Sequence, residues 1–365
     1  MSQPLSPDAS RLEVRPAADR RTEAAALPAS GASWVGFFFL MVAGALVFWV
    51  FDALPFQDLP AHAGLIALRH RAGSSPFEHR FFVVAPHIGP YSLFRFLGRI
   101  FYAPLGAVGA VRALETLPWI ATPLALVWAR RRLHGDRSLT AAYFGLALGF
   151  GFMTILGFAS YLLGVAALLA ALTIWLELMV ATDRGDATAT RWEIAAACVA
   201  PGVFLAHGHA FVIFVALAGV VALATGHRKA RIIRLRCLAP ALALAAWVAW
   251  RERASVIPPG SVAVRHADFA PHFQGVLDKL SLLITPTLIT RTGVDAVVGV
   301  FVWTVIIAAV VATARSLRDP PDRRTSDLEG AEAEQASRAH SRALLACMGV
   351  LAAAFFVLPH AIGWF

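Results

Sequence analysis

Apolar residues form long uninterrupted runs along this chain, separated by shorter polar segments. A helix needs about 20 apolar residues to cross a bilayer, and nine runs approach or reach that length. They are residues 34–51, 110–129, 139–157, 158–181, 192–206, 210–225, 237–250, 294–314 and 343–362. The first run is too long for a signal-peptide core and is followed by no small-residue cleavage site, so we interpret it as an uncleaved span. The pattern predicts an all-α polytopic transmembrane helical bundle.

Residues 91–105 form a further apolar segment, which carries Arg95 and Arg99. Charged residues are costly inside a span, so we favour a re-entrant or interfacial helix here. A tenth span is the alternative, and it would move the Arg130–Arg132 run to the outer face of the membrane.

Polar segments divide the remaining chain. Residues 1–33 contain four prolines and show no apolar stripe, which predicts a disordered cytoplasmic tail before a transmembrane domain of residues 34–365. Two long outer loops, 52–90 and 251–293, and one cytoplasmic loop, 315–342, join the spans. We expect juxtamembrane helices in both outer loops, the first ending at Arg71 and the second covering 273–283.

Composition agrees with a membrane protein. The apolar fraction is 58%, the charged fraction only 15% and the mean hydropathy +0.65. These values exclude a soluble enzyme, a secreted disulfide scaffold and a nucleic-acid binder. The three cysteines lie inside or beside apolar runs, which is typical of small core residues rather than of disulfides.

The distribution of basic residues predicts the orientation, because cytoplasmic loops retain arginine and lysine. With the amino terminus inside and nine spans, the inner segments hold 21 of the 32 basic residues and the outer segments hold seven. The count therefore favours the nine-span topology with the carboxyl terminus outside.

The first outer loop contains the segment Gln57-Asp58-Leu59-Pro60-Ala61-His62. Asp58 suits a helix N-cap, with Pro60 in the first turn. His62 follows four residues later, so both side chains share one helix face. The structural interpretation is a cap beside a headgroup-facing histidine. The functional one is a general base, Asp58, oriented by the His62 imidazole.

A second polar site is the turn Leu205-Ala206-His207-Gly208-His209, at the outer end of a predicted helical hairpin. Two histidines around a glycine either lie at the membrane interface or bind a ligand. Zinc sites need three or four ligands, and the other candidates (Asp58, His62, His266, Asp268 and His272) lie on separate loops. We assign no metal ligand and no cofactor, and a divalent metal stays open.

Other polar residues have structural explanations of equal weight. Arg112 and Glu115 are three residues apart in an apolar run, where they form an ion pair or line a polar cavity. Glu177 reaches the inner interface, and His87 lies in a proline-glycine turn.

The first half of the chain resembles an uncharacterised bacterial branch of the GT-C-type membrane glycosyltransferases. The resemblance rests on the acidic first loop at Asp58, on Gly89-Pro90-Tyr91, on Gly106 followed by Arg112, and on the basic turn Arg130-Arg131-Arg132. It covers residues 34–226, and Leu205-Ala206-His207 resembles a hairpin of uncharacterised bacterial relatives.

This resemblance implies a polyprenyl-phosphate sugar donor and an enzyme acting at the outer face of a bacterial cytoplasmic (inner) membrane. Asp58 would be the base, and Arg112 or the run containing Arg130 and Arg131 would bind the leaving phosphate, because guanidinium groups match phosphate geometry. His207 and His209 join this candidate binding set. The expected partners are the lipid-linked donor and membrane lipids, with no nucleic acid, and the sequence leaves the oligomeric state open. A transporter or lipid flippase and a non-catalytic membrane scaffold are the alternatives.

Overall fold

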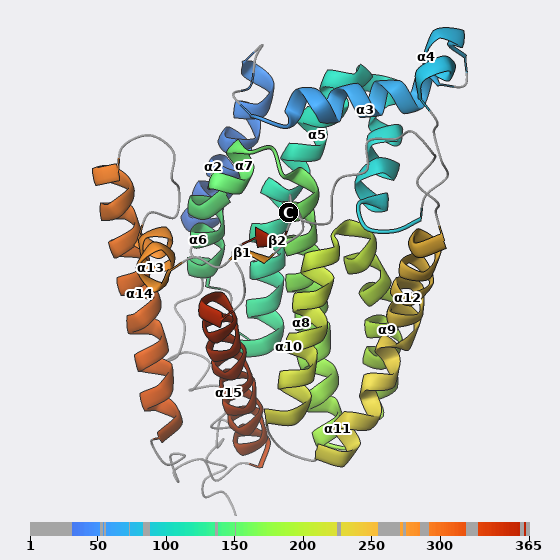
Figure 1. Cartoon of the computed structure of the whole chain (residues 1–365). Helices are drawn as coiled ribbons and strands as arrows, with labels where there is room; N and C mark the ends of the chain where they lie inside the picture. Colours follow the sequence, from blue (N-terminus) through green and yellow to red (C-terminus); the bar gives the residue numbers. More distant parts are fainter. Residues whose placement is uncertain are drawn as a thin grey trace, which may run out of the picture.

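A computed structural model of the chain consists mainly of helices (Figure 1). It describes residues 31–51, 54, 56–72, 74–82, 88–135, 138–149, 151–224, 228–254, 271–272, 275–284, 292–318, 328–357 and 361–362. Residues 1–30 of the predicted tail lie outside the described residues, as do His87, His266, Asp268 and the side chain of His272.

The fold is all-α, as the apolar pattern predicts. The helices within the nine runs are α2 (Gly31–Val50), α5 (Ser92–His134), α6 (Thr140–Gly149), α7 (Phe152–Ile155), α8 (Ala159–Asp183), α9 (Ala189–Ala206), α10 (Gly208–Ala224), α12 (Ala239–Ala254), α14 (Thr292–Arg318) and α15 (Leu328–Val357). The run 139–157 differs from the prediction because it is divided between α6 and α7. Two short segments, β1 (Pro271–His272) and β2 (Ala361–Ile362), pair antiparallel.

Five helices of the described chain are long and apolar enough to cross a membrane. They lie within Gly31–Val50, Ser92–His134, Ala159–Asp183, Ala230–Arg251 and Gly299–Arg318. The fourth combines α11 (Arg228–Arg234), the 3-10 helix η1 (Leu235–Leu238) and α12. The nine- or ten-span topology stays a prediction, because α9 and α10 are shorter than these helices.

Helix α5 is bent sharply at Gly106, where φ is 66° and ψ is −174°. The bend separates a first arm, residues 92–105, from a second arm, residues 107–134. A methyl group at Gly98 would lie 3.5 Å from Leu114 Cδ1, although 16 residues of continuous helix would separate these positions by about 24 Å. The first arm therefore turns back against the second, which is the geometry of a re-entrant or interfacial helix.

The predicted loop helices are present. Helix α3 (Leu59–Arg71) begins after Asp58 and lies across the top of the bundle, followed by α4 (Pro76–Phe81) (Figure 1). Helix α13 (Val276–Ile284) corresponds to the interfacial helix expected in the second outer loop.

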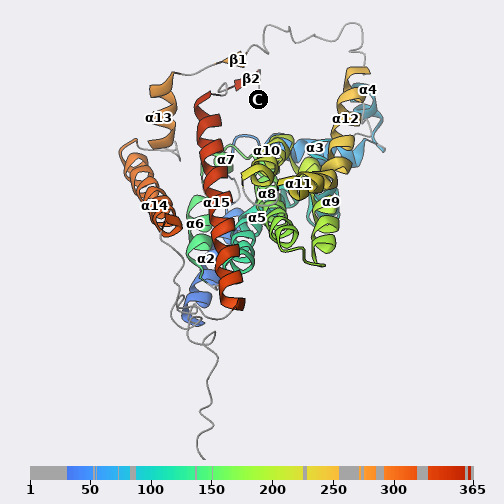
Figure 2. The ribbon, with the colours of Figure 1, turned by 90° about the horizontal axis from the view of Figure 1, so that it is seen from below.

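Two clusters of buried apolar side chains hold the bundle together. The first core joins α2, α3, α5 and α6 around Trp119, whose indole nitrogen donates to the Met41 carbonyl at 2.9 Å. A methyl group at Gly44 or Gly149 would overlap that indole, so both glycines permit close helix packing. The second core joins α8, α9, α10, α12 and α15 around the fully buried Trp175. Seen from below, α15 packs beside this second group while α14 stands apart (Figure 2).

Ion pairs gather at the end of the bundle opposite α3. Arg231 is buried and pairs with Asp183, and Glu193 pairs with Arg234 and Arg236. The guanidinium of Arg132 lies 4.8 Å from the Trp192 ring centroid at the same end. The segments that the charge count assigns to the inner face are therefore close together.

Candidate functional site

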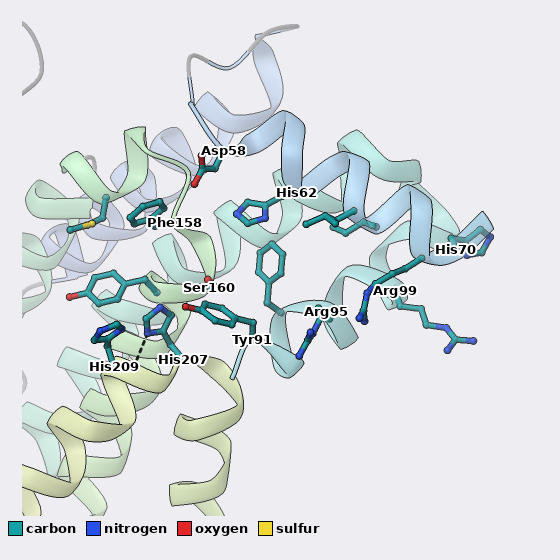
Figure 3. A pocket seen from close by; sticks show the side chains of 16 residues that line it. Asp58, His62, His70, Tyr91, Arg95, Arg99, Phe158, Ser160, His207 and His209 are labelled. Carbon is teal, nitrogen blue, oxygen red and sulfur yellow. Dashed lines mark hydrogen bonds between the residues drawn. The ribbon is translucent and has the colours of Figure 1, made fainter. Parts of the chain in front are cut away.

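A cavity of about 920 Å³ lies under α3 at the end of the bundle (Figure 3). Its first wall comes from α3 and the first arm of α5, and its second from the start of α8 and the turn between α9 and α10. The lining residues are Asp58, His62, Leu65, Ile66, Arg69, His70, Tyr91, Phe94, Arg95, Arg99, Met153, Phe158, Ser160, Tyr161, His207 and His209. The cavity thus lies where the two cores meet.

Asp58 occupies the predicted N-cap position of α3, but its side chain makes no cap hydrogen bond. The backbone holds the residue instead, since Asp58 N–H donates to the Leu156 carbonyl at 3.1 Å. Gly157 permits this approach, because a methyl group there would lie 3.3 Å from the Asp58 nitrogen and φ is +79°. The carboxylate consequently lines the cavity.

His62 lies one helical turn after Asp58, with its ring centroid 4.9 Å from that of Phe94. Burial lowers the pKa of His62, and the Asp58 charge and a hydrogen bond with the Gly157 backbone oppose that shift. The imidazole is therefore mainly neutral at pH 7. A neutral imidazole both donates and accepts a hydrogen bond, which suits it to orient a carboxylate or a hydroxyl group.

His207 lies in the second wall and is 7% exposed. Its Nδ1 accepts a hydrogen bond from the His209 backbone N–H at 3.2 Å, so in the neutral ring the proton lies on Nε2. Burial, with a smaller effect of His209, lowers the pKa of His207 to about 4. The Tyr91 and Tyr161 rings meet the imidazole edge-on, at centroid distances of 5.0 and 5.2 Å.

Tyr91 has a left-handed backbone with φ of 68°, which is uncommon for a bulky residue. Side chains brace the surrounding turn: Gly89 N–H donates to Ser92 Oγ at 2.9 Å, and Arg95 Nη2 donates to the Pro90 carbonyl at 3.1 Å. Burial raises the pKa of Tyr91, so its hydroxyl stays protonated at neutral pH. Such strain persists only where neighbouring contacts impose it, and it is common at functional sites.

Three arginines line the cavity, and two of them, Arg95 and Arg99, lie in the part farther from Asp58 (Figure 3). Arg69 comes from α3, and Arg95 and Arg99 come from the first arm of α5. Among the described lining residues, Asp58 is the one carboxylate, so the cavity has an excess of positive charge. The Nε atom of Arg95 is buried without a hydrogen-bond partner in the described structure. This arrangement can bind a phosphate or another oxyanion.

The structure brings together four of the seven residues proposed from the sequence: Asp58, His62, His207 and His209 all line the cavity. Arg112 does not line it, and instead donates to the carbonyls of Trp49 and Phe51 at 3.2 and 2.7 Å. It therefore fixes the end of α2.

Arg130 and Arg131 also lie outside the cavity lining, near the last turns of α5. The Arg131 guanidinium is 5.0 Å from the Trp34 ring centroid, at the start of α2. Residue 130 is 24 positions beyond Gly106, roughly 36 Å along a helix, which separates this run from the cavity.

The sequence contained one signal for the arginines that were not proposed as site residues. Arg95 and Arg99 are four residues apart in an apolar segment, so they share one helix face. No comparable pattern singles out Arg69.

No group of three or more His, Cys, Asp or Glu side chains in the described ranges is arranged to hold a metal ion. Comparison of the chain with protein-family models, curated proteins and solved structures finds no match.

Proposed function

We propose that the chain is a multi-pass glycosyltransferase of a bacterial cytoplasmic membrane, similar to the GT-C type. It would transfer a sugar from a polyprenyl-phosphate donor to an acceptor hydroxyl at the outer face. One observation carries this proposal: a single cavity beside the interfacial helix α3 combines the Asp58 carboxylate with three arginines. A transferase of this kind needs a base and an oxyanion site in one substrate cavity.

In the proposed reaction, Asp58 accepts the proton of the acceptor hydroxyl. The acceptor oxygen forms a bond to the anomeric carbon while the bond from that carbon to the phosphate oxygen breaks. The departing polyprenyl phosphate retains the electron pair and carries the added negative charge. His62, mainly neutral at pH 7, orients the carboxylate.

The phosphate is assigned to Arg69, Arg95 and Arg99 rather than to Arg112, Arg130 or Arg131. Guanidinium groups donate two parallel hydrogen bonds to a phosphate, and several such groups stabilise the charge on the leaving group. Exposed Leu65 and Phe158 beside the cavity suit the first isoprene units of a lipid substrate.

The transporter alternative has less support. Glu177 lies 4.0 Å from Arg132. Arg132 is 20 residues beyond Arg112 on α5, roughly 30 Å along the helix, so Arg112 and Glu177 do not line one pathway. Glu115 is 1% exposed and does not line the cavity.

Asp58→Asn tests the proposal. The full chain is reconstituted in nanodiscs and given farnesyl phosphate esters of glucose, galactose and mannose, with a membrane extract as acceptor. Release of farnesyl phosphate from the active ester should fall at least about 100-fold in the variant, since an amide cannot act as the base. Asp186→Asn is the matched control, because Asp186 lies in an exposed turn at the opposite end of α8. Full activity of a stably inserted Asp58→Asn protein would overturn the assignment.

A further inference from the structure

One wall of the cavity has no part in the proposed proton transfer or phosphate binding. It consists of Tyr91, Tyr161, His207 and Ser160, which we call the aromatic wall. Tyr91 begins α5, Ser160 and Tyr161 belong to the first turn of α8, and His207 ends α9. These residues come from three segments of the chain, which meet because the two cores pack together at this point (Figure 3).

The aromatic wall is rich in uncharged hydrogen-bonding groups. His207 Nδ1 already accepts from the His209 backbone, so Nε2 carries the proton and can donate to a ligand. The two tyrosines add hydroxyl groups, and Ser160 adds another from a side chain that is 7% exposed. None of the four residues carries a charge at neutral pH, because burial keeps His207 neutral.

The rings also fix the shape of the wall. Both tyrosine rings meet the imidazole nearly perpendicularly, at 87° and 82°, so the three rings form a corner rather than a flat stack. A corner of aromatic faces with hydroxyl and imidazole donors fits a ring that has apolar faces and hydroxyl groups at its edge.

We propose that the aromatic wall binds the sugar ring of the donor and selects neutral hexoses over charged sugars. The inference rests on the proposed function and specifies its substrate class. A uronic acid would place a carboxylate against a wall with no arginine or lysine, and an amino sugar would place an ammonium there with no carboxylate. Burying either charge without a partner is unfavourable. Arg95, the nearest guanidinium in sequence to Tyr91, is assigned to the phosphate in the proposed function, and its Nη2 also donates to the Pro90 carbonyl and to Ser92 Oγ.

Binding to the full chain in nanodiscs tests the inference with three probes: farnesyl phosphate, its glucose ester and its glucuronic acid ester. We expect the glucose ester to bind about tenfold more tightly than the glucuronic acid ester. Tyr161→Phe, which removes one oxygen, should weaken binding of the glucose ester about fivefold and change binding of farnesyl phosphate less than about twofold. Tyr143→Phe is the matched control, since that hydroxyl donates to the Ser33 carbonyl outside the cavity.

The outcomes separate the two proposals. Equal or tighter binding of the glucuronic acid ester overturns the inference, and so does a Tyr161→Phe effect of equal size on all three probes. If farnesyl phosphate binds and Arg95→Gln weakens it, but the sugar adds no affinity, only the aromatic-wall inference fails. If no probe binds to the stably inserted protein, both the proposed function and the aromatic-wall inference fail.

A second pair of variants tests the His207 donor. His207→Gln should retain more affinity for the glucose ester than His207→Phe, because glutamine keeps a hydrogen-bond donor.

Discussion

At the scale of single residues, the surroundings decide which polar side chains are available for chemistry. Asp58 is held by its backbone and leaves its carboxylate free of a capping role. His207 has one ring nitrogen committed to the backbone of His209 and the other directed to a ligand-sized space. Both residues are therefore fixed in position while retaining a polar atom for binding.

His207 should make stability depend on pH. Burial lowers its folded-state pKa to about 4, whereas an exposed histidine titrates near its ordinary value of 6.5. Between these values the unfolded chain binds a proton that the folded chain does not, so folding weakens as the pH falls from 6.5 to 4. We expect the midpoint temperature of thermal unfolding to fall less steeply over this range in His207→Gln than in the natural chain. The difference between the two midpoint temperatures should be constant above pH 7.

His134→Gln serves as the control, since His134 is exposed. Parallel curves for the natural chain and His207→Gln would contradict the prediction.

Some of this residue-level detail is predictable from sequence. Asp58 followed by Pro60 correctly indicated where α3 begins. The absence of a side-chain cap was not predictable, because it depends on the contact with Leu156 and Gly157, about 100 residues later. A sequence pattern around Asp58 cannot predict a contact with a segment so distant in the chain.

At the scale of the element, the bend in α5 determines where two of the three cavity arginines lie. Gly106 combines positive φ with ψ near 180°, a region that is essentially restricted to glycine. The first arm turns back at this residue and carries Arg95 and Arg99 under α3.

Gly106→Ala should therefore disturb the first arm. An added methyl group at Gly106 meets no atom within 4 Å, so the cost comes from the backbone and is about 1–3 kcal/mol. We expect lower thermal stability and weaker binding of farnesyl phosphate, measured by melting and titration in nanodiscs. Gly202→Ala, in the middle of α9 with equally open space, should leave both quantities nearly unchanged. Equal behaviour of the two variants would show that the bend does not depend on glycine.

Apolar runs predicted the existence of the helices well, because burial or lipid contact of a 20-residue segment needs no knowledge of its partners. The sequence did not reveal that 139–157 is divided into α6 and α7, although it favoured a re-entrant or interfacial helix at 91–105, where the first arm folds back. Both features arise from packing, and the Thr154 hydroxyl in α7 donates a hydrogen bond to the Gly149 carbonyl at the end of α6.

At the scale of the whole molecule, the cavity and the ion pairs lie at opposite ends of the bundle. Helix α8 joins them: Ser160 lines the cavity, and Asp183 pairs with Arg231 at the other end. The 25 residues of α8 extend roughly 37 Å, enough to cross the apolar thickness of a bilayer. The charge count and this separation together favour an outer cavity.

Cysteine labelling tests that orientation. Ala61 on α3 and Ala187 in the turn after α8 are both exposed alanines, one at each end. With Cys198 replaced by alanine to remove an exposed native thiol, a membrane-impermeant maleimide added to intact cells should label Ala61→Cys and spare Ala187→Cys. Opening the cells should make Ala187→Cys reactive as well. The reverse pattern would place the cavity on the inner face.

Which residues from distant segments line the same cavity was the hardest feature to predict. The four residues proposed from the outer loops line one cavity: Asp58, His62, His207 and His209. The residues proposed for the phosphate, Arg112, Arg130 and Arg131, lie outside its lining. Arg112 instead fixes α2, and the other two lie at the far end of α5. Their separation becomes visible only when the helices are given directions in space.

The position of the cavity between two cores has a consequence for unfolding. The wall from α3 and α5 belongs to one core, and the wall from α8 and the His207 turn borders the other. A ligand that contacts both walls binds only when both cores are folded, so ligand binding couples the folding of the two cores. A bound ligand should therefore raise the free energy of unfolding of both cores together.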